Sequence, residues 1–226
     1  IAQVVLGVMP VLLLILFVWK KMYQTPIVGT VFIILIFLCN LAYAFLARWY
    51  AVLHSGVKGE RRLFRTVKKL HGTNIVFHNL PVRYKRGRSE LDMLIVCHAG
   101  VLIIEVKNHS GTISGSWRDD KWTQRKHYRD GKVTETMMDN PIKQMRRQRD
   151  IVKSILTAAG ENVWIDSVLY FSSPNAKLKI SLRESDYVCC ESAELLEFLK
   201  SYDSGETLSK SRMEHIAQIL RESSGV

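Results

Sequence analysis

Residues 89–111 read SELDMLIVCHAGVLIIEVKNHSG, and this stretch decides the fold. It holds two apolar runs joined by a short turn, which predicts a β-hairpin. Asp92, Glu105 and Lys107 lie within these runs or at their ends. Charged groups at such positions are costly unless they are paired or bound to a metal ion. These three side chains are therefore the first candidates for a functional site.

The face of the hairpin on which each charge lies follows from strand periodicity. Glu105 and Lys107 share a face because alternate residues of a strand point to opposite sides of the sheet. Their strand neighbours are aliphatic on both faces, which predicts a central strand covered on both sides. A two-residue turn at 98–99 would place Asp92 opposite Glu105. A turn at 99–100 would place it opposite Lys107, and a three-residue turn would place it on the other face.

Two carboxylates on one face raise each other's pKa, and a bound hard cation removes that conflict. Mg²⁺ (or Mn²⁺) typically takes one or two protein carboxylates and completes its coordination with water and phosphate oxygens. An ammonium group beside such a centre can stabilise developing negative charge. The pattern therefore predicts a metal and phosphate site formed by Asp92, Glu105 and Lys107. The alternatives are an exposed salt bridge between Glu105 and Lys107 and a turn position for Asp92.

The rest of the chain predicts a mixed α/β domain. The dipeptide Asn140-Pro141 is typical of a helix start. In chain order, we expect a helix at 59–70, a strand at 75–84 interrupted by Pro81, the two strands within 89–111, a hairpin at 111–125, a loop at 127–139, a helix at 141–159, strands at 163–171 and 186–190, and helices at 192–199 and 208–221.

The beginning of the chain has a different composition. Up to residue 47 it contains no acidic residue, and its only charges are Lys20 and Lys21. Apolar runs at 4–19 and 27–47 predict a hairpin of two membrane-spanning helices, because about 20 apolar residues cross a bilayer as a helix. Buried core helices and a cleaved signal peptide are the alternatives.

The distribution of charge predicts where the domain lies. The formal net charge is +11, and Lys20 and Lys21 are the only basic residues before residue 48. Lysine and arginine collect on the cytoplasmic side of membrane helices, so we expect a multi-pass protein of the inner (cytoplasmic) membrane with its domain in the cytoplasm. We place a basic linker at 48–58 and the domain at 59–226, with its core motifs at 59–158. The four cysteines show neither metal-ligand spacing nor a disulfide framework.

The order of the motifs resembles the nuclease-related domain (NERD) family within the PD-(D/E)xK nuclease superfamily. Asp92 and the Glu105-Val-Lys107 triplet reproduce the D-(x)12-E-x-K spacing, although Leu91 stands where the proline of "PD" would be. The matching segments are GERRLFRTVKKL, ELDMLIVCHAGVLIIEVKNHSGTISG, the tryptophan that follows, and NPIKQ, which together span roughly residues 57–158.

The resemblance implies a restriction-endonuclease-like fold, in which helices flank a mixed central sheet. It also implies that Asp92 and Glu105 bind a divalent metal, and that Lys107 is the catalytic lysine. Glu60 would complete or support the metal site, and Gln144 would face the site from the second helix of the domain. Taken alone, Glu60 is an ordinary carboxylate near a helix start and Gln144 a solvated glutamine.

Basic side chains surround these motifs. Each by itself would be a solvated surface residue, but around a phosphate-cleaving site they predict a surface that binds a nucleic-acid backbone. No motif for reading base sequence is present, so we expect recognition by structure or context. The predicted contacts are Arg83, Lys85, Arg86, Arg88, Lys121, Arg125, Lys126, Arg146 and Arg147.

The sequence thus predicts a membrane-anchored, divalent-metal-dependent nuclease, with DNA favoured over RNA as its substrate. One alternative is a non-catalytic nuclease-fold module that tethers nucleic acid or a partner protein at the membrane. Another is a structural membrane protein whose basic face meets anionic lipid. The sequence identifies no protein partner and is compatible with a homo-oligomer.

Overall fold

The structure is a computed structural model that describes residues 26–70 and 72–224. Contacts divide the chain into two units, Ile1–Val57 and Lys58–Val226. Helix α2 (Pro26–Val67) occupies the described part of the first unit and contributes its last turns to the second. Residues 48–58, which we expected to be a separate linker, are helical within α2.

One segment of α2 is compatible with a membrane span. Among the described residues, Gly29–Tyr50 is the only helical segment long and apolar enough to cross a bilayer, with a mean hydropathy of 2.4. This assignment rests on length and composition alone. The first predicted span, at 4–19, lies outside the described residues.

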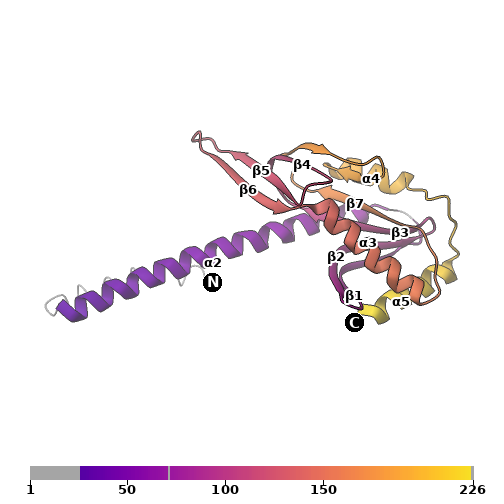
Figure 1. The fold of residues 1–226 in the computed structure, drawn as a ribbon, viewed down its shortest axis with the longest axis horizontal. Helices are drawn as coiled ribbons and strands as arrows, with labels where there is room; N and C mark the ends of the chain where they lie inside the picture. Colours follow the sequence, from indigo (N-terminus) through magenta and orange to yellow (C-terminus); the bar gives the residue numbers. More distant parts are fainter. Residues whose placement is uncertain (1–25, 71, 225–226) are drawn as a thin grey trace. The chain divides into compact units, whose positions relative to one another are not determined.

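The second unit is built on a five-stranded sheet with the order β1-β2-β3-β7-β9. Figure 1 labels the first four of these strands. Strands β1 to β3 are antiparallel, whereas β7 and β9 run parallel to β3, so the sheet is mixed, as expected. Strand β3 is central and buried, which confirms the prediction from its aliphatic faces. The bounds are β1 (Ile75–Tyr84), β2 (Gly87–Cys97), β3 (Gly100–Lys107), β7 (Ile165–Phe171) and β9 (Tyr187–Cys189).

Helices cover both faces of this sheet. Helices α3 (Pro141–Ala158) and α5 (Lys210–Ser224) pack on one face, where Leu94 and Ile103 belong to the same buried cluster as residues of both helices. The last turns of α2 and helix α4 (Ser192–Ser201) pack on the other face. Side chains of β2 and β3 therefore point alternately toward α3 and toward α2.

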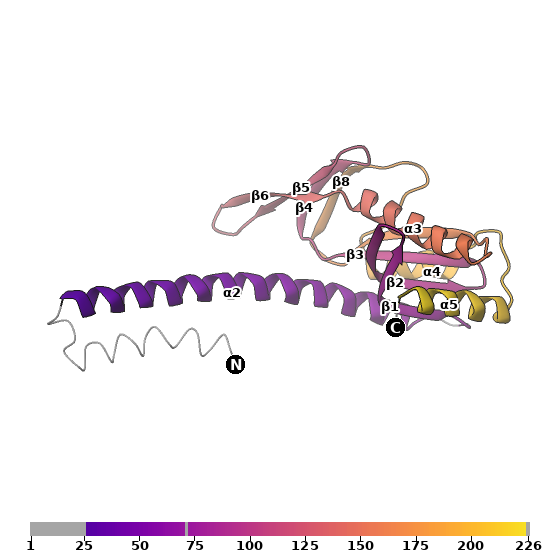
Figure 2. The ribbon, with the colours of Figure 1, turned by 60° about the horizontal axis from the view of Figure 1, so that its bottom comes forward.

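The second unit also contains a four-stranded sheet with the order β6-β5-β4-β8, in addition to the mixed central sheet that we expected. The predicted hairpin is confirmed as β4 and β5, and Figure 2 shows β5 and β6 extending together away from the central sheet. The bounds are β4 (Gly111–Ser116), β5 (Lys121–His127), β6 (Val133–Asp139) and β8 (Ala176–Ser181).

Three local predictions need correction. The prediction of a loop at 127–139 is wrong, because β6 forms there and pairs with β5. Strand β6 is an exposed edge strand, so it lacks the apolar alternation that marks a half-buried strand. Strand β8 is also an edge strand, and we did not predict it. The interruption expected at Pro81 is wrong as well. Strand β1 lies at an edge, where a residue without an N–H is tolerated, and it continues through Pro81.

Candidate functional site

The turn between β2 and β3 places two carboxylates face to face. Met93 pairs with Ile104 and Cys97 with Gly100, so the turn has two residues, 98–99. Continuing this register by one residue puts Asp92 opposite Glu105. Of the alternatives left by the sequence, the structure selects the one that brings these carboxylates together, on the face covered by α3.

Glu105 is the buried centre of the site. Its side chain is only 2% exposed. Its Oε1 accepts hydrogen bonds from Lys107 Nζ (2.6 Å) and Gln144 Nε2 (2.7 Å). Lys107 Nζ also donates to Gln144 Oε1 at 3.1 Å, so the three side chains form a closed triangle. Charge-assisted bonds of this kind are among the strongest in proteins, and they fix the orientation of both charged groups.

A second glutamine of α3 completes the network, and sequence reasoning missed it. Gln148 is fully buried, and its Nε2 donates to Glu105 Oε2 (2.7 Å) and to the backbone oxygen of Glu90 (3.1 Å). Its Oε1 has no partner among the described residues. The available signal was its spacing: residues four apart on a helix share a face, so Gln148 follows Gln144 toward the sheet.

The start of α3 holds both glutamines in place. Asn140 is the N-cap, as its sequence predicts, and its Oδ1 accepts a hydrogen bond from Ile142 N at 2.9 Å. Pro141 occupies the first helical turn, where its missing N–H costs nothing. The other end of the Asn140 side chain donates to the backbone oxygens of Ser116 (3.1 Å) and Asp119 (2.7 Å). The helix that carries Gln144 is thereby tied to the second sheet.

The carboxyl group of Asp92 has fewer hydrogen-bond donors than that of Glu105. Its Oδ2 accepts one hydrogen bond, from Val106 N at 2.7 Å. Burial raises the pKa of Asp92 to about 7, and the charge of Glu105 adds to that rise, which the Val106 bond and the Lys107 ammonium only partly oppose. A carboxylate with such a pKa would gain from a bound cation, because the cation favours its ionised form.

Glu60 approaches the Asp92–Glu105 site from α2, on the face of the sheet opposite α3. It follows Gly59, where an added Cβ would lie 2.9 Å from Ser172 Oγ, so the glycine lets α2 approach the ends of β3 and β7 closely. Glu60 Oε2 accepts a hydrogen bond from Asn79 Nδ2 at 3.4 Å. Its charge contributes to the raised pKa of Asp92, so Glu60 lies within electrostatic reach of the site but outside its hydrogen-bond network.

The donor set is suitable for a hard divalent cation that is shared with a substrate. Among the described residues, no group of three histidine, cysteine, aspartate or glutamate side chains could hold a metal ion by itself. Asp92 and Glu105 supply the two carboxylates that Mg²⁺ typically uses when water and phosphate oxygens fill its remaining positions. The raised pKa of Asp92 is the observation that favours this fit.

The predicted basic contacts fall into separate groups. Arg83, Lys85, Arg86 and Arg88 are exposed around the β1–β2 turn, and Lys121 and Arg125 are exposed on β5, where Lys126 is half-buried. On α3, Arg147 is exposed, whereas Arg146 is half-buried and paired with Asp186.

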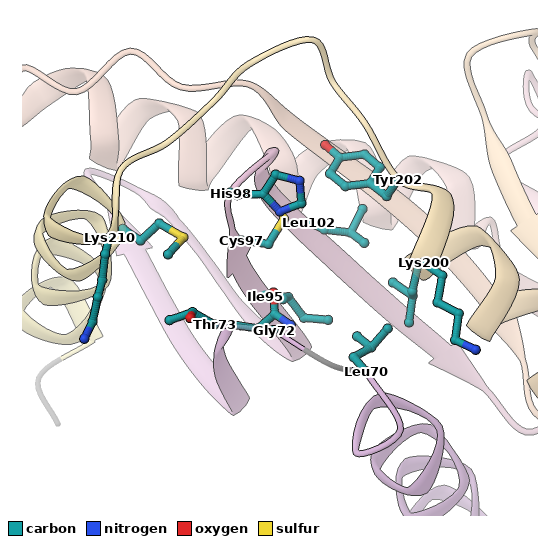
Figure 3. A pocket seen from close by; sticks show the side chains of 13 residues that line it. Leu70, Gly72, Thr73, Ile95, Cys97, His98, Leu102, Lys200, Tyr202 and Lys210 are labelled. Atoms are coloured by element: carbon teal, nitrogen blue, oxygen red, sulfur yellow. The ribbon is translucent and has the colours of Figure 1, made fainter.

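A cavity of about 520 Å³ lies at the opposite end of the β2–β3 hairpin (Figure 3). Cys97, His98 and Leu102 line it, with Lys200 and Lys210 on opposite sides. None of the predicted site residues lines this cavity. The candidate site is thus the carboxylate–lysine cluster at the other end of the same two strands.

Fold and site together define a mixed α/β protein with a buried carboxylate–lysine centre on paired central strands. The model of the nuclease-related domain family matches residues 55–172, more than half of the chain, and the chain belongs to this family. An uncharacterized protein of Bacillus anthracis is 34% identical over 71 residues, which make up 30% of this chain and 34% of that protein. The chain thus spans about a third of the length of this curated relative. No solved structure matches the chain.

Proposed function

We propose that the protein is a divalent-metal-dependent nuclease of the PD-(D/E)xK superfamily that hydrolyses phosphodiester bonds, in DNA rather than RNA. The observation that carries this proposal is the buried Glu105 carboxylate, which lies opposite Asp92 and is bonded to Lys107 and Gln144. Membership of the nuclease-related domain family supports it.

The residues of the site would divide the chemistry between them. Asp92 and Glu105 would hold Mg²⁺ or Mn²⁺, with Glu60 in support, and the bound ion would lower the pKa of a water and neutralise phosphate charge. Lys107 keeps its ammonium group at the site through Glu105 and would stabilise the charge that develops on the phosphate. Gln144 fixes the lysine and the glutamate relative to each other.

We further propose that the apolar part of α2 anchors the protein in the inner (cytoplasmic) membrane, with the nuclease domain in the cytoplasm. The span Gly29–Tyr50 and the basic residues that follow it support this arrangement. Two predicted spans would make the protein multi-pass.

One experiment tests the nuclease proposal directly. The full chain, purified in detergent, is incubated with labelled DNA or RNA in Mg²⁺, in Mn²⁺ or in excess EDTA. Cleavage of DNA that requires either ion is the expected result. The proposal is contradicted if cleavage persists in EDTA, or if no cleavage occurs with either Mg²⁺ or Mn²⁺.

A second function, nucleic-acid tethering without cleavage, is favoured by a different observation. Donors from Lys107, Gln144 and Gln148 already occupy both oxygens of Glu105, so this carboxylate is satisfied without a metal ion. If the protein only tethers DNA, its affinity for DNA should not depend on Mg²⁺. Calorimetry should then detect no heat of Mg²⁺ binding. Under the nuclease proposal, Mg²⁺ binds the wild-type chain and fails to bind the Asp92→Ala variant.

A further inference from the structure

A second concentration of positive charge lies outside the Glu105 network. Three guanidinium groups surround the indole ring of Trp117 and form the Trp117 cluster. The Cζ atom of Arg183 lies 3.8 Å from the ring centroid, that of Arg118 lies 4.6 Å away and that of Arg146 lies 5.4 Å away. At these distances each guanidinium is attracted by the ring face. The three side chains come from the segment after β8, the β4–β5 turn and α3.

The charges of this cluster are only partly balanced. Asp186, whose side chain is 5% exposed, accepts from Arg146 Nη2 through both oxygens, at 2.8 and 2.7 Å. The backbone N–H of Arg183 also donates to Asp186 Oδ2, at 3.0 Å. In the described part of the chain, no carboxylate lies within ion-pair distance of the Arg118 or Arg183 guanidinium. Two exposed guanidiniums therefore remain available to an external anion.

The cluster is held rigidly against the helix of the candidate site. Asn140, the N-cap of α3, binds the backbone oxygens of Ser116 and Asp119, on either side of Trp117 and Arg118. Arg146 lies about 200° around α3 from Gln144, at 100° per residue. The cluster thus lies on the flank of α3 opposite the face that meets Glu105. A site held in this way loses little conformational freedom when it binds.

A hollow of about 400 Å³ adjoins the cluster and extends along α3 from Lys143 to Ser154. Arg146 belongs to both, and Tyr84, Lys143, Arg147 and one carboxylate, Asp150, line the hollow beside it. Lys143 is paired with Asp120 at 2.6 Å, so Arg146 and Arg147 are the arginines that the hollow offers to an anion. Arginine is the side chain best suited to phosphate, because its planar fork matches the oxygen geometry and it is weakly hydrated. Cationic grooves that carry aromatic rings are typical of surfaces that follow a nucleic-acid strand.

We propose that the Trp117 cluster and the adjoining hollow bind the sugar–phosphate backbone of a nucleic-acid strand, away from the bond to be cleaved. This inference rests on the proposed function, and it gives the second sheet a role in holding substrate. Long substrates would contact both flanks of α3, whereas a small phosphodiester would contact the Glu105 side alone.

Binding is measured without catalysis. The full chain in detergent is titrated against a fluorescein-labelled DNA oligonucleotide, single-stranded and duplex, in EDTA at several salt concentrations, and anisotropy gives the dissociation constant. The double variant Arg118→Ala/Arg183→Ala should bind about ten-fold more weakly or worse, because two phosphate contacts are lost. Its log–log salt dependence should be shallower by about 1.4–1.8, at 0.7–0.9 per contact. An unchanged affinity and slope with both DNA forms overturns the proposal.

A matched control removes the same charge elsewhere. Lys200 and Lys210 flank the cavity at the opposite end of the β2–β3 hairpin (Figure 3), and Lys200→Ala/Lys210→Ala should bind DNA as the wild type does. An equal loss in both double variants would mean that net charge alone matters, and would also overturn the proposal. Hydrolysis of bis(p-nitrophenyl) phosphate with Mg²⁺ tests the nuclease proposal separately, since this substrate carries no flanking strand that the cluster could hold. Its rate should be the same in the wild type and both double variants.

Discussion

At the scale of single residues, Asp92 and Glu105 differ in how their charges are balanced. Glu105 accepts three hydrogen bonds from side chains, whereas Asp92 accepts one from the backbone and has a pKa raised to about 7. Hydrogen bonds therefore fix the position of the Glu105 carboxyl group. Asp92 is the carboxyl group whose ionised form would gain most from a bound cation.

Substitutions at the three charged residues should have different consequences. Asp92→Ala and Glu105→Ala should each abolish cleavage and Mg²⁺ binding, because each removes a carboxylate ligand. Lys107→Ala should retain Mg²⁺ binding but slow turnover by about 10²–10³-fold, as is typical when one stabiliser of the transition state is lost. Cleavage assays and calorimetry on the same preparations measure both effects.

Exchanging two charges separates a metal site from a salt bridge. The variant Glu105→Lys/Lys107→Glu keeps an ion pair on the same face but moves the carboxylate two residues along β3. We expect no cleavage. Wild-type cleavage by this variant would mean that Glu105 and Lys107 form only a salt bridge.

The raised pKa of Asp92 also predicts how stability depends on pH. Between the ordinary value of 3.8 and the folded value of about 7, the folded state holds a proton that the unfolded state releases. This contribution favours folding at low pH and is lost as the pH rises through 7. At about 1.4 kcal/mol per pKa unit it is at most about 4 kcal/mol, and less where water reaches the carboxyl group.

Urea unfolding of the full chain in detergent at pH 5 and pH 8 tests this dependence. Asp92→Asn should remove most of it and should be more stable than the wild type at pH 8. Mg²⁺ should raise the free energy of unfolding of the wild type at pH 8 but not that of the variant. A variant that loses stability at pH 8 contradicts the assigned pKa.

At the scale of secondary structure, the start of α3 links the two sheets to the site. Asn140 caps the helix through Oδ1 and holds the β4–β5 turn through Nδ2. The same helix presents Gln144 and Gln148 to Glu105. A disturbance at this cap should therefore reach the carboxylate network.

Asn140→Ala should lower the free energy of unfolding by about 2–4 kcal/mol, because it removes an N-cap and the hydrogen bonds that the Asn140 amide donates to the backbone oxygens of Ser116 and Asp119. Asn140→Asp retains an N-cap acceptor but loses the donor to Ser116 and Asp119, so it separates the two roles. We expect Asn140→Asp to be destabilised as well, when measured by urea unfolding. Full stability of Asn140→Asp would show that the cap alone matters.

The elements that the sequence predicted are those that carry a hydrophobic pattern, a turn signal or a helix-start signal. The aliphatic faces around Glu105 identified β3 as central, and Asn140-Pro141 identified the start of α3. The turn length between β2 and β3 stayed open, because periodicity fixes a face but not a register. Strands β6 and β8 were missed because exposed edge strands lack a hydrophobic pattern. Gln148 was missed because its partners, Glu105 and Glu90, are distant in sequence.

At the scale of the whole molecule, an apolar helical segment and a basic domain occur in one chain. Gly29–Tyr50 is uncharged apart from Arg48, whereas exposed lysine and arginine side chains are spread over the second unit. Anchoring would confine the proposed nuclease to nucleic acid near the membrane.

Cell fractionation tests the proposed anchoring. The full chain should sediment with membranes and stay there in high salt and in alkaline carbonate, because a spanning helix is held by apolar burial and not by charge. A reporter fused after Val226 should be active in the cytoplasm, whereas one inserted at Gln24 should be external. Release by salt alone, or the reverse reporter pattern, contradicts the proposed topology.

The contact between the end of α2 and the end of β7 has a consequence for synthesis of the chain. The Arg62 side chain donates to the backbone oxygen of Ser172, which is 110 residues further along. At about 5–20 residues per second, a ribosome needs about 5–20 s to add that length. During this interval Leu63 and Val67 lack the strand β7 that later covers them. The nascent chain therefore carries an incompletely covered apolar helix end for seconds, which is a period when a chaperone can shield it.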